Sequence, residues 1–392
     1  MKRAEFLPYC RPALGADDIA AVVDTLERGW LTTGPLVKRF EADFAAACGV
    51  KHAIALNSCT SAMHLALIAL GVGPGDEVVL PALSFVAAAN LVLQLGAEPV
   101  FCDVEAGSLC STVATIDRAT TKRTKAIVTM HYAGRPAAAA PISAYARSRG
   151  IGVLEDAALA VGTLDDGRWP GFCTDAAAFS FYATKNVTTA EGGMLVTRDD
   201  EIADRVRSLS LHGMDKDAWK RYERGGAWRY DVLETGYKYN MPDMAAAIGL
   251  TQLAKLPANQ KRRDELAAAY IAGLEDVPGV SAAALGSMRT NDRHSWCVFP
   301  ILVEEQTAGI SRDALIEALR DRNIGTSVHY IPSHLFSAYK HRRHGPLQVT
   351  EAEWLKLVSL PLFPGMSDTD VADVVAAIKD SVPAASRSRV GL

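Results

Sequence analysis

Short apolar runs alternate with helical segments from about residue 50 to residue 209, and this alternation constrains the fold more than any other feature of the sequence. Several of the helical segments stop at a glycine, as helices commonly do. Strands that alternate with helices form a mainly parallel sheet with helices on both faces. The predicted strands are 53–56, 77–80, 99–104, 126–130, 152–155, 176–181 and 192–197, and the predicted helices are 61–70, 82–95, 142–149 and 201–209.

The pattern changes near residue 240, where Pro242 is placed to start a long helix. A chain of 392 residues favours about two domains. We therefore predict a large α/β domain over residues 1–255 and a smaller C-terminal α+β domain over residues 256–392. The elements expected in this part of the chain are helices 242–256, 260–274, 311–323 and 368–379 and strands 296–303 and 326–330.

Composition excludes several classes of protein. The apolar stretches are much shorter than the ~20 residues needed to cross a membrane, and no apolar signal core follows the N-terminus, so we expect a cytoplasmic protein without membrane insertion. The net charge of −4 comes without a long basic block, so no nucleic-acid partner is expected. The seven cysteines include no Cys-x-x-Cys pair, which favours free thiols and argues against a metal site.

Lys185 is the first candidate for a catalytic residue. It follows the predicted strand 176–181, which contains the hydroxyl of Ser180. A lysine at the exit of a buried strand can be desolvated enough to act as an amine nucleophile and form a Schiff base with an aldehyde cofactor. The alternative is a solvated surface charge, which is the usual state of a lysine.

Residues 57–61 form a candidate anion site between a predicted strand and a predicted helix. The free N–H groups and the positive dipole end of a helix start attract anions, and neighbouring hydroxyls add donors, so a phosphate is the expected guest. The alternative is that Asn57, Ser58 and Thr60 only cap the helix.

Two further residues suit a flat, nitrogen-containing cofactor. Asp156 lies just past a predicted strand, at the edge of a parallel sheet where ligands bind, and its carboxylate could hold a pyridine nitrogen protonated. Phe85, at the predicted start of a helix, could stack on the ring. The alternatives are a helix N-cap for Asp156 and core packing for Phe85.

These residues occur in the order and topology of one cofactor site, and the chain resembles the DegT/DnrJ/EryC1/StrS family of pyridoxal-phosphate sugar aminotransferases from about Phe6 to Met366. The motifs that carry the resemblance are Gly29-Trp-Leu-Thr-Thr-Gly-Pro35, Asn57-Ser-Cys-Thr60, Glu155-Asp-Ala-Ala158, Phe179-Ser-Phe-Tyr-Ala-Thr-Lys185, Glu191-Gly-Gly193, Gly236-Tyr-Lys-Tyr-Asn240 and Ser359-Leu-Pro-Leu-Phe-Pro364. Within the family the chain is most similar to the UDP-4-amino-4-deoxy-L-arabinose–oxoglutarate aminotransferases. That similarity lies in Phe6-Leu-Pro-Tyr-Cys-Arg-Pro12, His131-Tyr-Ala-Gly134, Ala190-Glu-Gly-Gly193 and Gly309-Ile-Ser-Arg-Asp-Ala-Leu315.

The resemblance implies the fold type I of pyridoxal-phosphate enzymes, with a mixed, mostly parallel seven-stranded sheet in the large domain. It makes Lys185 the internal aldimine lysine and the proton shuttle. Asp156 would hold the pyridinium N–H and Phe85 would stack on the ring. The phosphate would be bound by Cys59 through its backbone, by Thr60 and by Ser180.

The resemblance also implies an obligate homodimer with shared active sites. Lys238 or Asn240, in the segment 236–240, would reach the phosphate of a neighbouring subunit. The residues that fall in segments resembling those that face the sugar are Trp30, Thr32, Glu191, His212, His329 and Tyr330.

The implied reaction moves an amino group from L-glutamate, which leaves as 2-oxoglutarate, to a keto group of a nucleotide-linked sugar, with C4 the expected carbon. Three alternatives stay open: an aminocyclitol ketone or other keto-sugar of antibiotic biosynthesis as acceptor, a sugar dehydratase with the same cofactor, and a regulator that only senses the cofactor. The related dehydratases would have a histidine in place of Lys185, and a regulator would need an appendage for which the chain offers no segment. One residue departs from the family pattern, since Leu159 stands where His or Gln usually lies beside the phenolic oxygen of the cofactor and cannot donate a hydrogen bond.

Overall fold

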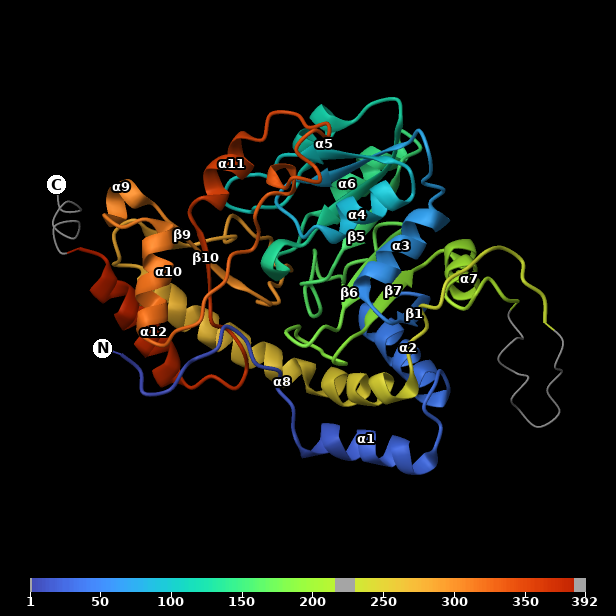
Figure 1. Ribbon diagram of the computed structural model, residues 1–392, viewed down its shortest axis with the longest axis horizontal. Helices are drawn as coiled ribbons and strands as arrows, with labels where there is room; N and C mark the ends of the chain where they lie inside the picture. The colour runs from blue at the N-terminus through green and yellow to red at the C-terminus, as the bar shows by residue number, and fades with distance from the viewer. Residues whose placement is uncertain (1, 216–229, 384–392) are drawn as a thin grey trace.

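A seven-stranded sheet forms the centre of the larger part of the molecule (Figure 1) in this computed structural model, which describes residues 2–215 and 230–383. The strand order is β1-β7-β6-β5-β4-β2-β3, and β7 runs antiparallel to both of its neighbours while the other pairs are parallel. The predicted mixed, mostly parallel sheet is therefore confirmed. The strands are β1 (His52–Leu56), β2 (Glu77–Pro81), β3 (Glu98–Cys102), β4 (Thr124–Met130), β5 (Gly152–Asp156), β6 (Ala176–Ser180) and β7 (Gly193–Thr197).

Helices cover both faces of this sheet, because the side chains of its buried strands alternate between the faces. In β6, Ala176 and Ala178 face the core under one helix layer, whereas Ala177 and Phe179 face the core on the other side. The first layer contains α3 (Cys59–Ala69), α4 (Ala87–Gln94) and α7 (Asp200–Leu209). The second contains α2 (Pro35–Cys48), α5 (Val113–Ala119), α6 (Ala139–Arg147) and the first half of α8 (Asp243–Leu274), with α1 (Ala16–Arg28) packed outside α8.

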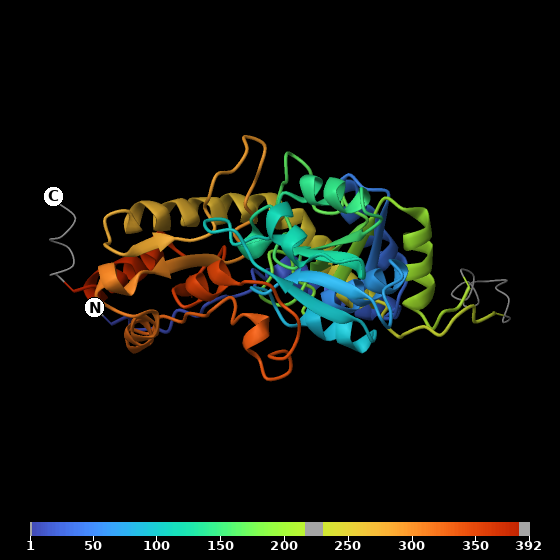
Figure 2. The same ribbon diagram turned by 90° about the horizontal axis from the view of Figure 1, so that it is seen from above.

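A second, three-stranded antiparallel sheet lies beside the other half of α8 (Figure 2), in the order β10-β9-β8. Its core joins Tyr270 of α8 to Phe299 and Ile301 of the central strand. The elements of this part are β8 (Val280–Ala282), β9 (Phe299–Val303), α9 (Glu305–Ala308), α10 (Arg312–Asp321), α11 (Gln348–Trp354), β10 (Leu357–Leu360) and α12 (Asp368–Ser381). The described residues also form the short 3₁₀ helices η1 (Tyr132–Gly134) and η3 (Ser333–Leu335). None of the helices in residues 2–215 and 230–383 is long and apolar enough to cross a membrane.

Two predictions of secondary structure were wrong. The helices expected at 242–256 and 260–274 are one continuous helix, α8, which contains Pro257 in its interior. A proline there costs about 3 kcal/mol, but α8 buries Leu256 in one core and Leu266 in the other, and this burial on both sides of the proline outweighs the cost. The predicted strand 326–330 is only an isolated bridge between Ser327 and Ser359. The proposed domain boundary at residue 255 lies inside α8 and stays a prediction.

The turn between α1 and α2 is held by a residue distant in sequence. The carboxylate of Asp243 accepts hydrogen bonds from the backbone N–H groups of Gly34 (2.8 Å), Leu36 (3.1 Å) and Val37 (3.0 Å), so the start of α8 caps the start of α2. A Cβ atom on Gly34 would lie 2.0 Å from Nε1 of Trp30. The motif at 29–35 therefore forms a tight turn that fixes the position of Trp30.

The buried ring of His294 makes stability depend on pH. The backbone N–H of Trp296 donates to its Nδ1 (2.9 Å), which requires a neutral acceptor, and burial lowers the pKa of His294 from the usual 6.5 to about 3. Because the unfolded chain binds this proton more readily, the free energy of unfolding should fall as pH drops below about 6.5 towards 3. We expect the Tm to decline between pH 7 and pH 5 less steeply in His294→Gln than in the wild type. Equal slopes would contradict this origin.

Candidate active site

The carboxyl ends of β5 and β6 bring two candidate residues to one edge of the sheet. Asp156 is the last residue of β5, Ser180 is the last residue of β6, and the two strands pair in parallel. The chain then forms a closed loop, because the N–H of Phe181 donates to the carbonyl of Gly192 (2.9 Å). Lys185 lies in this loop, and its own N–H donates to the carbonyl of Tyr182 (2.9 Å). Because both ends of the loop are joined at the edge of the sheet, Lys185 lies near this edge.

The start of α3 has the form of an anion site. Ser58 is the N-cap, and its hydroxyl accepts a hydrogen bond from the N–H of Ser61 (3.0 Å). The N–H groups of Cys59 and Thr60, at the first two helical positions, find no acceptor in the part of the chain that the structure describes. Ser58 thus does cap the helix, as the alternative interpretation held, and two backbone donors remain for a phosphate.

Close packing of β7 holds Ser180 next to this helix start. Gly193 pairs with Leu56 on one side and with Ser180 on the other. A Cβ atom on Gly193 would lie 2.3 Å from the carbonyl carbon of Ser58 and 2.4 Å from the N atom of Cys59. Only a residue without a side chain at position 193 lets the start of α3 pack this closely on β7, the strand that pairs with Ser180.

Gly193→Ala should therefore weaken cofactor binding. The added methyl group must push the start of α3 away from β6, and overpacking of this kind costs roughly 1–3 kcal/mol. We expect the dissociation constant of the cofactor, measured by equilibrium dialysis, to rise about tenfold or more. Gly73→Ala is the matched control, because a Cβ atom there meets nothing within 4 Å. An unchanged dissociation constant in Gly193→Ala would show that this packing does not position the phosphate site.

Asp156 is buried, with 3% of its surface exposed, and its carboxylate accepts a hydrogen bond from the N–H of Ala158 (3.0 Å). No other residue in the described ranges donates to it. Burial raises the pKa of Asp156, while the N–H of Ala158 and the charge of Lys185 act in the opposite direction. No helix follows Asp156 within residues 157–163, so the interpretation as a helix N-cap was wrong. The free oxygen is available to a ligand.

The amine of Lys185 has neither a hydrogen bond nor an ion pair with any residue of the described segments, and the residue is half-buried. Its charge lowers the pKa of Asp156 and that of His329, so it lies near both. The interpretation as a fully solvated surface charge was therefore wrong. Cys10 joins the loop from the N-terminal segment, since its thiol donates to the carbonyl of Thr184 (3.4 Å).

Phe85 lies two residues before α4, not at the first position of the helix, and is 54% exposed. The core-packing alternative was therefore wrong for this residue. Its ring centroid is 6.0 Å from that of Tyr330. His329 is fixed by Ser359, whose hydroxyl is 2.8 Å from Nδ1, and by Tyr132, whose hydroxyl donates to the His329 carbonyl. Burial, helped by Lys185, lowers the pKa of His329 to about 4, so this ring is neutral near pH 7.

The segment 236–240 runs beside the phosphate site of its own chain. The carbonyl of Tyr239 accepts from the N–H of Asn57 (2.7 Å), and the amine of Lys238 donates to the side-chain oxygen of Asn240. The amide of Asn240 in turn donates to the hydroxyl of Thr33 (2.7 Å). Lys238 and Asn240 are thus placed next to the Trp30 turn. Their predicted contact with a neighbouring subunit stays a prediction.

The other predicted sugar-facing residues are exposed and lie on turns. Glu191 precedes Gly192 at the end of the Lys185 loop, and Thr32 accepts from the N–H of Asp243 (3.1 Å). His212 has a left-handed backbone (φ 63°), and its N–H donates to the carbonyl of Tyr237 (2.7 Å). These positions leave the side chains of Trp30, Thr32, Glu191 and His212 accessible to a ligand.

The sequence interpretation missed a buried pair behind Asp156. Nε2 of His131 lies 2.7 Å from the carboxylate of Glu155, which also accepts from the N–H of Gly171 (2.7 Å). The N–H of Ala137 donates a hydrogen bond to Nδ1 of His131 (3.1 Å), so the ring proton is on Nε2. This Nε2–H donates a hydrogen bond to the carboxylate of Glu155. The signal available in the sequence was a second acid directly before Asp156, which strand alternation directs to the opposite face.

Comparison with known proteins identifies the family of this chain. Residues 12–379 match the DegT/DnrJ/EryC1/StrS aminotransferase family. The chain belongs to this family. It is 46% identical over 388 residues to the spore coat polysaccharide biosynthesis protein SpsC of Bacillus subtilis, covering 98% of this chain and 99% of SpsC.

Solved structures of two proteins extend the comparison. Spr1654 of Streptococcus pneumoniae, solved in a PLP form, is 29% identical with a TM-score of 0.88, covering 96% of this chain and 98% of its own, and its PMP form gives 30% and 0.88. DesI, solved in the presence of its TDP-sugar product, is 30% identical with a TM-score of 0.87, covering 98% of this chain and 94% of its own. The chain is a sugar aminotransferase, and pyridoxal phosphate is its cofactor.

The residues present fit this cofactor. The unpaired N–H groups of Cys59 and Thr60 suit a phosphate, the free oxygen of the buried Asp156 suits a pyridine N–H, and the unpaired amine of Lys185 suits a carbonyl carbon. The exposed ring of Phe85 is available for stacking. The described residues contain no cluster of three or more side chains that could hold a metal ion.

Proposed function

We propose that this sugar aminotransferase moves an amino group from L-glutamate to the C4 keto group of a nucleotide-linked sugar. SpsC, by its name, acts in polysaccharide biosynthesis, and DesI was solved with a TDP-sugar, which supports a nucleotide-linked acceptor. The observation that carries the proposal is the unpaired, half-buried amine of Lys185 close to the buried carboxylate of Asp156.

Each residue has a distinct task in this proposal. Bound pyridoxal phosphate supplies a carbonyl that takes up the amino group and a ring that withdraws electrons. Lys185 holds the cofactor through Nζ and then accepts and returns a proton at the same atom. Asp156 keeps the ring nitrogen protonated, and Phe85 fixes the plane of the ring. Ser180, Thr60 and the N–H of Cys59 hold the phosphate.

The acceptor sugar would meet a second group of residues. His329, neutral near pH 7, can accept or donate one hydrogen bond to a sugar hydroxyl, and Tyr330 beside Phe85 closes the same side of the site. Leu159 is buried in the same hydrophobic cluster as Met130 and Tyr132, and its own side chain cannot donate a hydrogen bond to the phenolic oxygen of the cofactor. The remaining sugar-facing residues would be Trp30, Thr32, Glu191 and His212.

The proposal includes a cytoplasmic homodimer with shared active sites. Ile19, Val23 and Leu26 form an exposed apolar stripe along α1, with 65%, 45% and 50% of their surfaces exposed. An apolar stripe of this kind on a water-soluble protein favours contact with another protein surface. A second copy seated there would lie near the Trp30 turn and would bring Lys238 or Asn240 towards the other site.

The experiment that tests the function follows the two half-reactions by absorption. L-glutamate should convert the bound cofactor to its amino form, and one nucleotide-linked 4-keto sugar should restore the original spectrum. Aminocyclitol ketones serve as the comparison. If only these ketones restored the original spectrum, the acceptor would be an aminocyclitol ketone and not a nucleotide-linked sugar. A bound cofactor that glutamate leaves unchanged would contradict the donor, and release of water from the sugar without amino transfer would indicate a dehydratase.

A further inference from the structure

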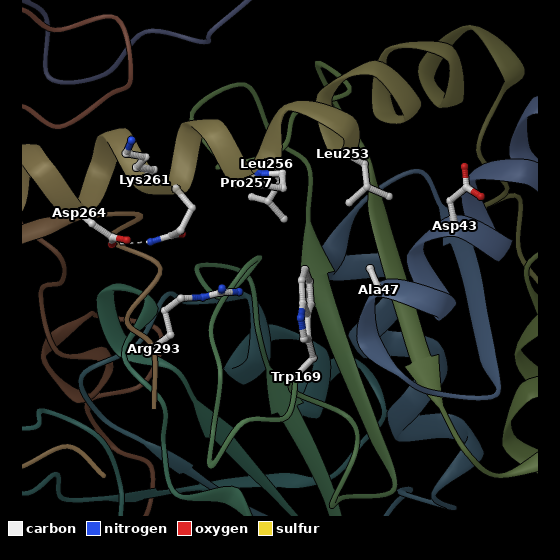
Figure 3. Close-up of a pocket in the computed structure, with 10 residues that line it drawn as sticks. Asp43, Ala47, Trp169, Leu253, Leu256, Pro257, Lys261, Asp264 and Arg293 are labelled. Atoms are coloured by element: carbon white, nitrogen blue, oxygen red, sulfur yellow. Dashed lines mark hydrogen bonds between the residues drawn. The ribbon is translucent and has the colours of Figure 1, made fainter. Parts of the chain in front are cut away.

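A cavity of about 420 Å³ lies between α8, α2 and the loop that carries Trp169 (Figure 3). Its apolar wall consists of Ala47, Leu253, Leu256 and Pro257. The indole of Trp169 packs edge-to-face on Phe44 (ring centroids 5.8 Å) and against Phe179 (6.1 Å), which belong to the core on the α2 face of the sheet. The cavity is therefore on the face opposite α3 and its phosphate site.

The cations of this cavity are unpaired. Arg293 uses its Nε to bond the carbonyl of Gly162 (2.7 Å), but its two terminal nitrogens have no hydrogen bond or ion pair with the residues that the structure describes. The amine of Lys261 has none in those ranges either. Figure 3 shows the guanidinium of Arg293 pointing from below towards the space beside Trp169. Arg293 is half-buried, and the opposite charge of Asp264 acts on it only from beyond ion-pair distance, so its terminal nitrogens lack a direct partner.

The two acids of the cavity, in contrast, have partners among the neighbouring side chains. The carboxylate of Asp264 accepts from the side-chain amide of Gln260 (2.8 Å), a contact visible in Figure 3, and Asp43 forms an ion pair with Arg39 (3.6 Å). Neither acid is within ion-pair distance of Arg293. The lining contains two acids and two bases, and with Asp43 paired to Arg39 the two cations face one carboxylate, that of Asp264, so one positive charge remains uncompensated.

We propose that this cavity binds a planar anion, an aromatic ring that bears one carboxylate or one phosphate. The ring would lie between Trp169 and the apolar side chains of Leu253 and Leu256, and the anionic group would take the two terminal nitrogens of Arg293, with Lys261 at the rim. Arginine suits this task because its planar fork matches the oxygens of a carboxylate or a phosphate. The volume lies within the range of about 300–1,000 Å³ typical of small-molecule sites.

Calorimetric titration of the cofactor-loaded protein tests the proposal with four probes. Indole-3-acetate and phenyl phosphate carry both the ring and the anion, tryptophol carries a ring without the anion, and acetate carries the anion without a ring. We expect at least one of the first two to bind at millimolar concentration and the last two to bind much more weakly. Binding of only one aromatic anion would identify the carboxylate or the phosphate as the recognised group. Tryptophol binding as tightly as indole-3-acetate, or no binding by either aromatic anion, would overturn the proposal.

Variants locate the site. Arg293→Gln should weaken binding of the aromatic anion about tenfold, the value of one charge-assisted contact of roughly 1.4 kcal/mol. Lys261→Gln should weaken it less, and this exposed side chain makes no contact on which folding depends. Arg118→Gln removes an exposed arginine elsewhere, on α5, and is the matched control. Equal affinities in Arg293→Gln, Lys261→Gln and the control would place the anion elsewhere and overturn the proposal.

Discussion

Replacing Lys185 with alanine should abolish amino transfer and remove the absorption band of the lysine-bound cofactor. The variant loses both the nucleophile and the proton-transfer group, and proton transfer alone is worth about 10²–10⁴-fold in rate. We expect turnover to fall roughly 10⁴-fold or more, measured with L-glutamate in a single half-reaction by stopped-flow absorption. The fold should be retained, because the side chain of Lys185 forms no hydrogen bond with the described residues.

Two controls sharpen this result. Lys185→Arg keeps the positive charge near Asp156 but cannot form a Schiff base, so it should be as inactive as the alanine variant. Lys122→Ala removes an exposed lysine from another surface and should leave turnover unchanged. Appreciable activity in Lys185→Arg would mean that Lys185 contributes charge alone, and the assignment of the nucleophile would then be wrong.

Asp156→Asn should produce the second largest loss. The amide has nearly the same shape as the carboxylate but no charge to hold the ring nitrogen protonated. Breaking a buried charge pair costs about 3–5 kcal/mol, which corresponds to a loss of roughly 10²–10⁴-fold in the rate of the glutamate half-reaction. Burial already raises the pKa of Asp156, so its charged form is disfavoured when no ring nitrogen is present to pair with it. With the cofactor removed from both proteins, the asparagine variant should therefore be no less stable than the wild type.

The Asp156→Asn experiment therefore has two readouts. The rate of the half-reaction should fall, while the Tm of the protein freed of cofactor should stay the same or rise. Asp156→Glu keeps the charge at a displaced position and should recover part of the rate. If the asparagine variant retained the wild-type rate, another group would have to keep the ring nitrogen protonated.

The sequence was sufficient to predict the position of Asp156, the site residue at the end of β5. Asp156 follows a predicted strand of a parallel sheet, so its position at the edge where ligands bind could be predicted from periodicity, whereas the pairing that places Ser180 beside it could not. Lys185 lies five residues past its strand, in a loop, where no periodicity applies. It was favoured over other lysines by its place after a buried strand, by the acid and the anion site that suit the same cofactor, and by the resemblance to a family. The contact of Gly193 with the start of α3 also depends on tertiary packing, which no local pattern encodes.

The errors have a common physical cause. Pro257 and the segment 326–330 were interpreted from local propensity, and tertiary structure overrode it in both cases. Pro257 is tolerated because the helix is anchored in a core on each side. The segment 326–330 is joined to β10 by an isolated bridge between Ser327 and Ser359 rather than by a ladder. The pair of His131 and Glu155 was missed because its partners come from separate segments, Glu155 from β5 and His131 from the turn that follows β4.

The unbroken α8 has a consequence for how the molecule comes apart. At 1.5 Å per residue its 32 residues extend about 48 Å, and it supplies side chains to the cores of both sheets. Unfolding of either core removes the packing that keeps the helix intact across Pro257. The other core then loses the side chains that the helix supplies to it. The two sheets should therefore lose structure together, as one cooperative calorimetric transition, although each has a hydrophobic interior of its own.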